Sequence, residues 1–267
     1  MNLLCEQLTV AYGARTVLRD CTLSCEGGEM AFLLGVNGAG KSTLLKALAG
    51  LLPPKAGAVR CGGAALCGMP LRERAKTVAY LPQTIPATDM TVLEYVLLGA
   101  APHLAFGAVP GKGWEDRAFA VLRQVGAEML AGRSMDQISG GEAQRSALAQ
   151  VLLTDARFLL LDEPTASLDV RYQHEFLMCL RSLARERQKG VLVSVHDPNL
   201  ALRYADRIYV LTHGCVQTFI RSEAWGETLL ATLQKTYGAE LCYGTRCAFD
   251  WNESERGEDC CTQRGIM

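Results

Sequence analysis

A glycine-rich stretch near the N-terminus constrains the fold of this chain more than any other feature. The stretch Gly35-Val36-Asn37-Gly38-Ala39-Gly40-Lys41-Ser42 fits the pattern Gly-x4-Gly-Lys-Ser in full. It directly follows Met30–Leu34, an apolar run typical of a fully buried strand, and precedes Thr43–Ala49, whose apolar spacing is helical. The sequence therefore predicts a strand, a glycine loop and a helix in immediate succession, the arrangement of a phosphate-binding loop.

Each residue type in this loop has a physical reason to be there. Glycines let backbone N–H groups point inward at phosphate oxygens, and the following helix presents its positive N-terminus. Lys41 is expected to reach the β- and γ-phosphates, and the Ser42 hydroxyl to coordinate Mg²⁺. We therefore expect ATP and Mg²⁺ as cofactors, with the nucleotide contacted by Gly35, Asn37, Gly38, Ala39, Gly40, Lys41, Ser42 and Thr43.

Much of the chain alternates between short apolar runs and helical patterns. Further strands are predicted at Val78–Leu81, Phe158–Asp162, Val191–Val195 and Arg207–Leu211. Helices are predicted at Gly141–Leu153, Arg171–Gln188 and Asn199–Tyr204. Strands separated by helices imply βαβ units with right-handed crossovers, so the predicted fold class is α/β with a parallel-sheet core.

The alternation is lost from about Met90 to Met135, where helical patterns at Thr91–Gly99 and Trp114–Gly126 predict a helical insert. Before the glycine loop, Asn2–Cys25 is strand-like with a turn at Tyr12–Arg15. We therefore divide the 267 residues into one ATPase domain, residues 1–221, with a helical subdomain at about 90–153, and a C-terminal part, residues 222–267. That part combines a helix, ending near residue 237, with a polar tail.

Composition narrows the class of protein and its expected location. The formal net charge is −1 and no stretch is dominated by Lys and Arg, which weighs against a nucleic-acid partner. No apolar run approaches the roughly 18 residues needed to cross a bilayer, and Met1–Val10 does not resemble a secretory signal. We expect a cytosolic chain whose 11 cysteines are mostly reduced.

Two acidic residues end one of the predicted buried strands. The run Phe158–Leu161 is followed by Asp162 and Glu163. Because the carboxyl ends of parallel strands form the edge of the sheet where ligands bind, both acids are expected near the phosphate loop. Asp162 is placed to hold Mg²⁺ and Glu163 to polarise an attacking water. A strand end with a helix-capping Asp is the alternative interpretation of the pair.

A second glycine-containing segment opens the predicted helix that ends at Leu153. Ser139 stands three residues before Glu142, the spacing of a capping box. Capping does not explain the adjacent Gly140 and Gly141, which lower helix stability. They are useful if the phosphate of another molecule must approach the helix N-terminus closely.

With these residues the chain resembles the nucleotide-binding subunit of an ABC transporter. The stretch Ser139-Gly140-Gly141-Glu142-Ala143-Gln144-Arg145 is similar to the family signature, and the resemblance covers roughly residues 1–237. It implies a P-loop cassette with a parallel-sheet core, an antiparallel β subdomain and a helical subdomain. It departs from common family residues at Val36, Ile138 and Gln150, which leave the expected activity unchanged.

The resemblance also implies roles for individual residues. Tyr12 lies where an aromatic ring stacks on adenine, and Asp169, in Ser167-Leu168-Asp169, belongs to a loop that crosses the dimer interface. Gln83 matches a residue that senses Mg²⁺ and water, and His196 one that contacts the γ-phosphate. The implied partner is a second copy bound head to tail, so that the signature residues Ser139, Gly140, Gly141 and Glu142 act on the other subunit's nucleotide.

Finer features resemble one subgroup, the importers of iron–siderophore, haem and vitamin B12. They are the runs His196–Ala201 and Leu98–His103, the latter with Ala100 in place of an arginine, together with Arg74–Lys76 and Tyr237-Gly238. Membership implies two integral membrane permease subunits, an extracellular or periplasmic binding protein, and a peripheral position on the cytoplasmic face of the membrane.

Two alternatives from other classes stay open on the sequence. They are a soluble ABC ATPase of DNA repair or translation and the cassette of an exporter. Soluble relatives typically carry tandem cassettes, long coiled coils or zinc modules, and the sequence shows no such pattern. The tail cysteines Cys242, Cys247, Cys260 and Cys261 fit no zinc spacing, and a poorly ordered tail is the simpler interpretation.

Overall fold

A six-stranded sheet forms the centre of the computed structural model, which describes residues 1–221, 225–237, 241–243 and 249–251. The strand order is β10-β9-β3-β8-β7-β6, and every pair is parallel except β9 with β10. Their bounds are Met30–Leu34 (β3), Val78–Leu81 (β6), Phe158–Asp162 (β7), Gly190–Ser194 (β8), Arg207–Thr212 (β9) and Cys215–Ile220 (β10). All residues of β3, β7 and β8 are buried, because both faces of the sheet are covered.

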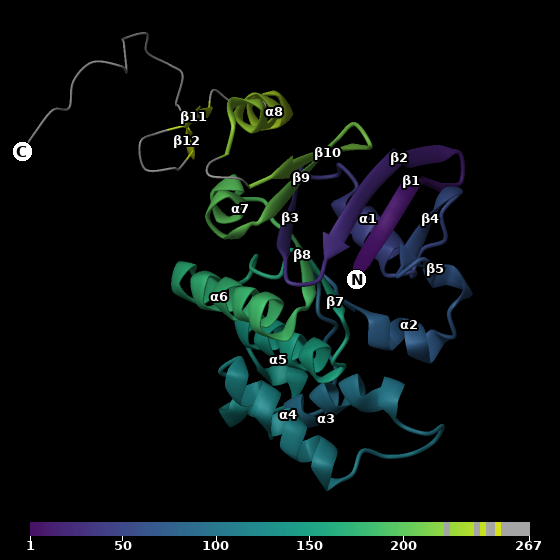
Figure 1. Ribbon diagram of the computed structural model, residues 1–267. Coiled ribbons are helices and arrows are strands. Elements are labelled where there is room, and N and C mark those ends of the chain that lie inside the picture. The colour runs from purple at the N-terminus through teal and green to yellow at the C-terminus, as the bar shows by residue number, and fades with distance from the viewer. Residues whose placement is uncertain (222–224, 238–240, 244–248, 252–267) are drawn as a thin grey trace, which may run out of the picture.

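An antiparallel sheet packs over one side of this core (Figure 1). Its order is β2-β1-β4-β5, with bounds Asn2–Tyr12 (β1), Arg15–Glu26 (β2), Ala56–Cys61 (β4) and Ala64–Ala65 (β5). The predicted turn between β1 and β2 is confirmed, with Gly13 at a φ of 57°. Helix α1, Lys41–Leu48, shares a hydrophobic core with this sheet, in which Leu44, Leu45 and Leu48 are fully buried.

The helical insert has a core of its own. It contains α3 (Val92–Leu97), α4 (Lys112–Gln124) and α5 (Gly140–Leu153), with 3-10 turns at Leu98–His103 (η2), Glu128–Leu130 (η3) and Met135–Gln137 (η4). Val92, Val96, Leu122 and Leu153 are among the residues that form this core. In Figure 1 these helices gather at one end of the molecule, away from the antiparallel sheet.

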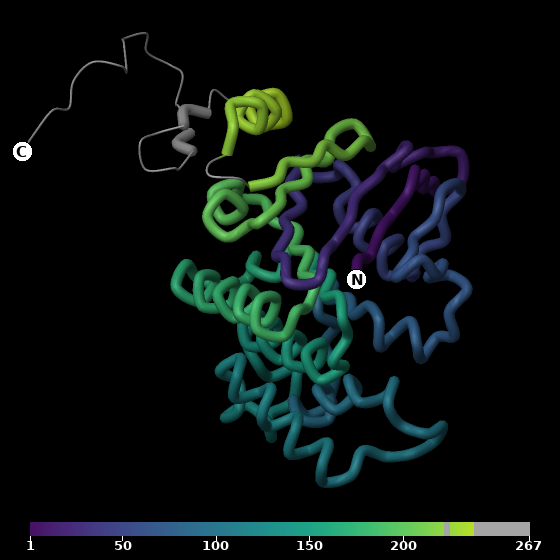
Figure 2. Tube along the Cα trace, viewed as in Figure 1, coloured from purple at the N-terminus to yellow at the C-terminus, as the bar shows by residue number. Residues whose placement is uncertain are grey.

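The remaining helices cover the parallel sheet. They are α6 (Val170–Arg187), α7 (Pro198–Tyr204) and α8 (Glu227–Tyr237), and α8 lies beside the β9–β10 hairpin at the end opposite the helical insert (Figures 1 and 2). Shorter elements are η1 (Leu66–Gly68), α2 (Leu71–Thr77), β11 (Leu241–Tyr243) and β12 (Phe249–Trp251). Within the described part of the chain, the helices are all too short or too polar to span a bilayer.

Helix α2 and strand β10 have no counterpart among the predicted elements. Neither contains a buried residue: α2 has none, and β10 is an edge strand of exposed and half-buried positions. Hydrophobic periodicity reports burial, so elements that bury nothing leave no such signal. Predicted strand and helix ends otherwise differ from the observed ones by only a few residues.

The described cysteines are free thiols. Cys5, Cys21, Cys25 and Cys61 are buried, and burial raises the pKa of the Cys5 thiol to about 12. The side chains of the tail cysteines, Cys242, Cys247, Cys260 and Cys261, lie outside the described residues. No group of His, Cys, Asp or Glu side chains suited to a metal ion occurs in the part of the chain that is described.

Candidate functional site

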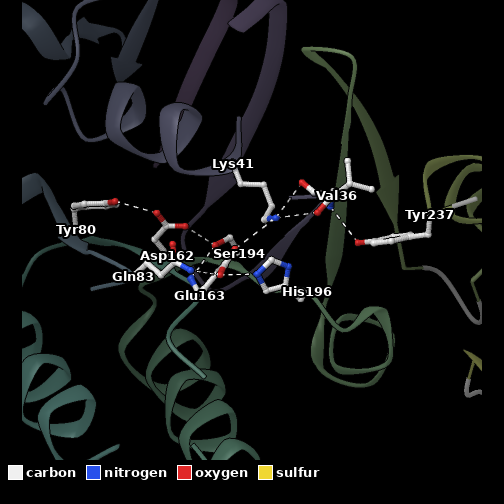
Figure 3. A network of polar contacts seen from close by, with 10 residues as sticks. Val36, Lys41, Tyr80, Gln83, Asp162, Glu163, Ser194, His196 and Tyr237 are labelled. Atoms are coloured by element: carbon white, nitrogen blue, oxygen red, sulfur yellow. Dashed lines mark hydrogen bonds and ion pairs between the residues drawn. The ribbon is translucent and has the colours of Figure 1, made fainter. Parts of the chain in front are cut away.

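Four parallel strands deliver their C-terminal ends to one edge of the central sheet. The glycine loop follows β3, Gln83 follows β6, Asp162 and Glu163 stand at the end of β7, and His196 follows β8. These segments are far apart in the chain, yet Figure 3 shows their side chains turned toward one another. The structure therefore brings together the loop, the acid pair, the glutamine and the histidine that the sequence singles out.

The glycine loop adopts a backbone that needs its glycines. Gly35, Gly38 and Gly40 have φ angles of 154°, 77° and 107°. A Cβ on Gly35 would lie 2.6 Å from the carbonyl oxygen of Leu211, and one on Gly40 would lie 2.9 Å from a methyl group of Val17. Helix α1 begins directly afterwards at Lys41, so its positive end points into the loop.

The Lys41 side chain is folded back onto the loop and is only 5% exposed. Its Nζ donates to the carbonyl oxygen of Gly35 at 2.9 Å and lies 3.5 Å from that of Val36. It also forms an ion pair with Glu163, at 3.5 Å between Nζ and Oε1 (Figure 3). A buried ammonium group needs such partners, and a phosphate group could replace them.

Glu163 is the centre of the polar network. One oxygen, Oε2, accepts from Gln83 Nε2 at 2.6 Å and lies 2.6 Å from His196 Nε2. The residue is 6% exposed and has a φ of 49°, in the left-handed region, where a non-glycine residue costs about 1–2 kcal/mol. This conformation holds a buried carboxylate against Lys41.

Asp162 is fixed by two hydroxyl groups. Ser194 Oγ donates to Oδ1 at 2.8 Å and the Tyr80 hydroxyl donates to Oδ2 at 3.1 Å. Burial, and then the charge of Asp162, raise the pKa of Tyr80, so its hydroxyl keeps the proton that it donates. Ser194 Oγ also accepts from the backbone N–H of Glu163 at 2.8 Å, which links both acids to β8.

Sequence reasoning gave no role to Ser194 or Tyr80. A signal for Ser194 was present, because it is a polar residue in a strand whose other residues are apolar or glycine, and buried polar residues are the informative exceptions. For Tyr80 the sequence offered no comparable signal, since its partner is contributed by the neighbouring strand.

An open cavity lies in front of this network. Its lining includes Asn37, Gly38, Gly40, Lys41, Ser42, Thr43, Tyr12, Arg15, Val17, Gln83, Glu163 and His196. Tyr12 is one of these lining residues and is half-exposed. Ala39 instead lines a neighbouring hollow, and Gly35 is buried beneath the loop. The hydroxyl of Ser42, the carboxylate of Asp162 and the amide of Gln83 supply oxygen ligands of the type that Mg²⁺ prefers.

The signature segment lies elsewhere, at the start of α5. The predicted capping box is observed: Ser139 Oγ accepts from the backbone N–H of Glu142, whose carboxylate accepts from the N–H of Ser139 at 2.8 Å. The backbone N–H and the hydroxyl of Ser139 both donate to the Glu142 carboxylate, at 2.8 Å each, and these two hydrogen bonds lower the pKa of Glu142. Asp169 caps α6 by accepting from Tyr172 N–H at 3.0 Å.

The signature and Asp169 are thus near one another but not in the cavity. A Cβ on Gly140 would lie 3.7 Å from Ser167, and one on Gly141 would lie 3.3 Å from Leu168. None of Ser139–Glu142 or Asp169 lines the described cavity. One chain therefore brings together the loop, the acids, Gln83 and His196, whereas its signature segment lies outside their cavity.

Residues 18–166 match the family model for ABC transporters. The chain belongs to the ABC transporter family. The resemblance inferred from the signature is thereby confirmed, and the ABC cassette fold predicted with it agrees with the solved structures described below. Roles of individual residues within this ABC cassette remain predictions that its geometry supports.

Two curated relatives of this ABC cassette carry the same name. A hemin import ATP-binding protein HmuV of Bordetella avium is 39% identical over 249 residues, covering 90% of this chain and 93% of that protein. A protein of the same name from Burkholderia cenocepacia is 43% identical over 231 residues, covering 78% and 84%.

Solved structures share the fold of this ABC cassette. A dimeric bacterial ABC transporter cassette superposes with a TM-score of 0.76 at 28% identity, covering 83% of this chain and all of that one. An inward-facing ABC transporter of the metal-chelate type superposes with a TM-score of 0.79 at 24% identity, covering 94% and 98%. At that identity the second comparison concerns the fold alone.

Proposed function

We propose that this chain is the ATP-binding and ATP-hydrolysing subunit of an ABC importer, and that the imported cargo is haem. The observation that supports the enzymatic part is the contact of Glu163 with Lys41, Gln83 and His196 at the mouth of the loop cavity. The sequence left three chelates as cargoes, and we choose haem because two relatives at about 40% identity are named hemin import ATP-binding proteins. Siderophores and cobalamin have no comparable support.

In this proposal the triphosphate lies along the N–H groups of the loop at the positive end of α1. Lys41 exchanges Glu163 and the Gly35 carbonyl for phosphate oxygens, which frees the Glu163 carboxylate. Glu163 then takes a proton from the attacking water, while Gln83 and His196 orient that water and the γ-phosphate. Ser42, Asp162 and Gln83 would hold Mg²⁺, which neutralises phosphate charge when bound.

The second half of the site comes from another copy of the chain. Ser139 and Gly141, with Gly140 and Glu142 around them, stand at a capped helix N-terminus and do not line the chain's own cavity. A head-to-tail dimer would set this helix end against the partner's γ-phosphate, with Asp169 at the interface. The dimeric form of a structurally similar cassette supports this arrangement.

The partners in the membrane are two permease subunits. A haem-binding protein delivers haem to them from outside, and this chain lies on the cytoplasmic face. A surface on the helical insert is suited to a permease. It has a hollow lined mainly by residues of α3, η2 and the loop after it, with one residue each from α2 and α4. Phe106 and Val109 in this lining are 101% and 84% exposed. Exposed apolar clusters of this kind mark interaction sites.

Reconstitution of the whole transporter tests the cargo. The complex is placed in proteoliposomes and phosphate release is measured with the binding protein loaded with haem, ferric siderophore or cobalamin in turn. We expect stimulation by haem alone. Haem should also accumulate in the lumen of vesicles in which the ATPase subunits face the lumen and the loaded binding protein is outside. Stimulation by another chelate, without haem transport, would contradict the proposal for the cargo but leave the ATPase assignment intact.

A further inference from the structure

The C-terminal helix reaches the phosphate loop. Tyr237, the last residue of α8, places its hydroxyl 3.2 Å from the backbone nitrogen of Gly35 and accepts its N–H (Figure 3). The two residues are 202 positions apart in the chain. The proposed catalytic chemistry uses Gly35 but gives no role to Tyr237.

Gly35 directly follows the buried strand β3 and begins the loop. It is buried, so its N–H needs a protein partner in place of water. Its carbonyl oxygen accepts from Lys41 Nζ at 2.9 Å, and the carbonyl of Leu211 closes the space where a side chain would stand. When Lys41 turns to a phosphate, the Tyr237 hydroxyl, which accepts from the Gly35 N–H, is the side-chain contact that continues to hold this residue.

Helix α8 is anchored well enough to serve as a fixed support. Leu229 and Leu233 are 2% and 0% exposed and belong to the main hydrophobic core. Thr236 Oγ1 lies 3.2 Å from Thr212 Oγ1 on β9, a neighbour of β3 in the sheet. The Tyr237 ring packs against the same core as the two leucines. Its hydroxyl is thus held in place from two directions.

The hydroxyl remains neutral under the conditions in which the protein works. Burial raises the pKa of Tyr237 to about 12, with the Gly35 N–H opposing this shift and the charge of Asp197 adding to it. A neutral hydroxyl accepts from the Gly35 N–H without placing a negative charge beside the triphosphate, which would repel it.

We propose that Tyr237 is a positioning residue for nucleotide binding, which makes helix α8 part of the nucleotide site. By accepting from the N–H of Gly35 it keeps the first turn of the loop in the conformation that phosphates require. The proposal rests on the assignment of Gly35–Thr43 as the nucleotide-binding loop.

The test is Tyr237→Phe in the full chain, which removes one oxygen and keeps the ring. One hydrogen bond of this kind corresponds to about a three- to tenfold change in an equilibrium constant. We expect the Kd for a fluorescent ATP analogue, and KM in the reconstituted complex, to rise by about that factor with kcat within about twofold. Deuterium exchange at the Gly35 amide should become faster. Tyr204→Phe is the matched control, since that buried tyrosine contacts His174 at 2.6 Å, away from the loop.

Wild-type nucleotide affinity and unchanged Gly35 exchange in Tyr237→Phe would overturn the inference. Lys41→Ala separates this failure from failure of the site itself: if that variant also binds normally, the loop assignment is wrong. If Tyr237→Phe unfolds below the assay temperature, deuterium exchange at the Gly35 amide of the unaltered chain is the deciding measurement. A Gly35 amide that exchanges as fast as those of exposed Asn37 and Gly38 would refute the contact, and a protected one supports it.

Discussion

Glu163 combines more of the site's chemistry than any other residue. Its carboxylate contacts a lysine, a glutamine and a histidine from three different elements, and its backbone is held in the left-handed region. Such a conformation persists only where the surrounding structure fixes it. Removing single groups from this network therefore gives the most direct tests of the proposed chemistry.

Glu163→Gln preserves the shape of the side chain and removes its capacity to take a proton. General-base catalysis typically contributes about 10²–10⁴-fold, so we expect hydrolysis by the reconstituted complex to fall at least about 100-fold. ATP should still bind and hold the subunits together. Phosphate release and size-exclusion chromatography with ATP measure the two effects, and near-normal turnover would show that Glu163 is not the base.

Lys41→Ala removes the buried ammonium group that is expected to contact the phosphates. Hydrogen bonds to charged groups are worth about 1.5–3 kcal/mol, which corresponds to roughly a 10- to 100-fold increase in Kd. Titration of a fluorescent ATP analogue measures this increase in Kd. Lys46→Ala is the control, because Lys46 is exposed on the same helix and should leave the affinity unchanged.

At the scale of elements, the two ends of α5 have different tasks. Its N-terminus presents the capped signature segment, while its C-terminal half packs inside the helical insert. Gly99 of η2 lies directly against it, since a Cβ there would be 2.3 Å from the carbonyl oxygen of Gln150. Function and stability can therefore be perturbed separately on one helix.

Gly141→Asp tests the functional end. An aspartate at a helix N-terminus favours the helix, but its charge would repel the partner's γ-phosphate. Combined with Glu163→Gln, it should leave the nucleotide affinity of one subunit unchanged and abolish ATP-dependent dimers in size-exclusion chromatography. A dimer that forms normally would show that the signature does not complete the partner's site.

Gly99→Ala tests the packed end. Insertion of a methyl group against a backbone carbonyl should lower the free energy of unfolding by about 1–3 kcal/mol. Gly113→Ala on the exposed face of α4, where nothing lies within 4 Å, should instead raise it by about 0.5–1 kcal/mol. Urea unfolding of the full chain measures both, and equal midpoints for the two variants would contradict the close contact with α5.

At the scale of the whole molecule, the nucleotide cavity lies between segments of the two sheets, and the helical insert carries the surfaces that we propose for other subunits. The insert has its own core, which would let it move as a unit in the proposed dimer. Its exposed apolar residues beside η2 are the proposed permease contact. A defect there should affect assembly and leave the chemistry of the cavity intact.

Phe106→Asp should therefore weaken capture of the permease by at least about tenfold in pull-down titrations, because a charge replaces a fully exposed apolar ring at the interface. The Kd for ATP should not change. Met129→Asp is the matched control, as Met129 is 92% exposed on η3 and does not line that hollow. Equal loss of permease binding in both variants would argue against a localised docking surface.

Much of this protein could be predicted from local patterns. The glycine loop, the strand that ends in two acids and the capped signature helix are each specified by neighbouring residues, since turn, cap and strand geometry are local properties. Their joint order led to the family, which the comparison confirms. Elements that bury little, α2 and β10, left no pattern to read.

Only the tertiary structure decided which side chains meet. The contacts of Lys41 with Glu163, of Ser194 with both acids and of Tyr237 with the loop after β3 join α1, β7, β8 and α8. No local pattern encodes such pairs, because they depend on strand order and on how each helix packs on the sheet. The sequence by itself therefore determined that a triphosphate-binding loop and a family signature are present. The fold decided that the signature lies outside the cavity of the loop and that the C-terminal helix supports the loop. Both positions arise from packing.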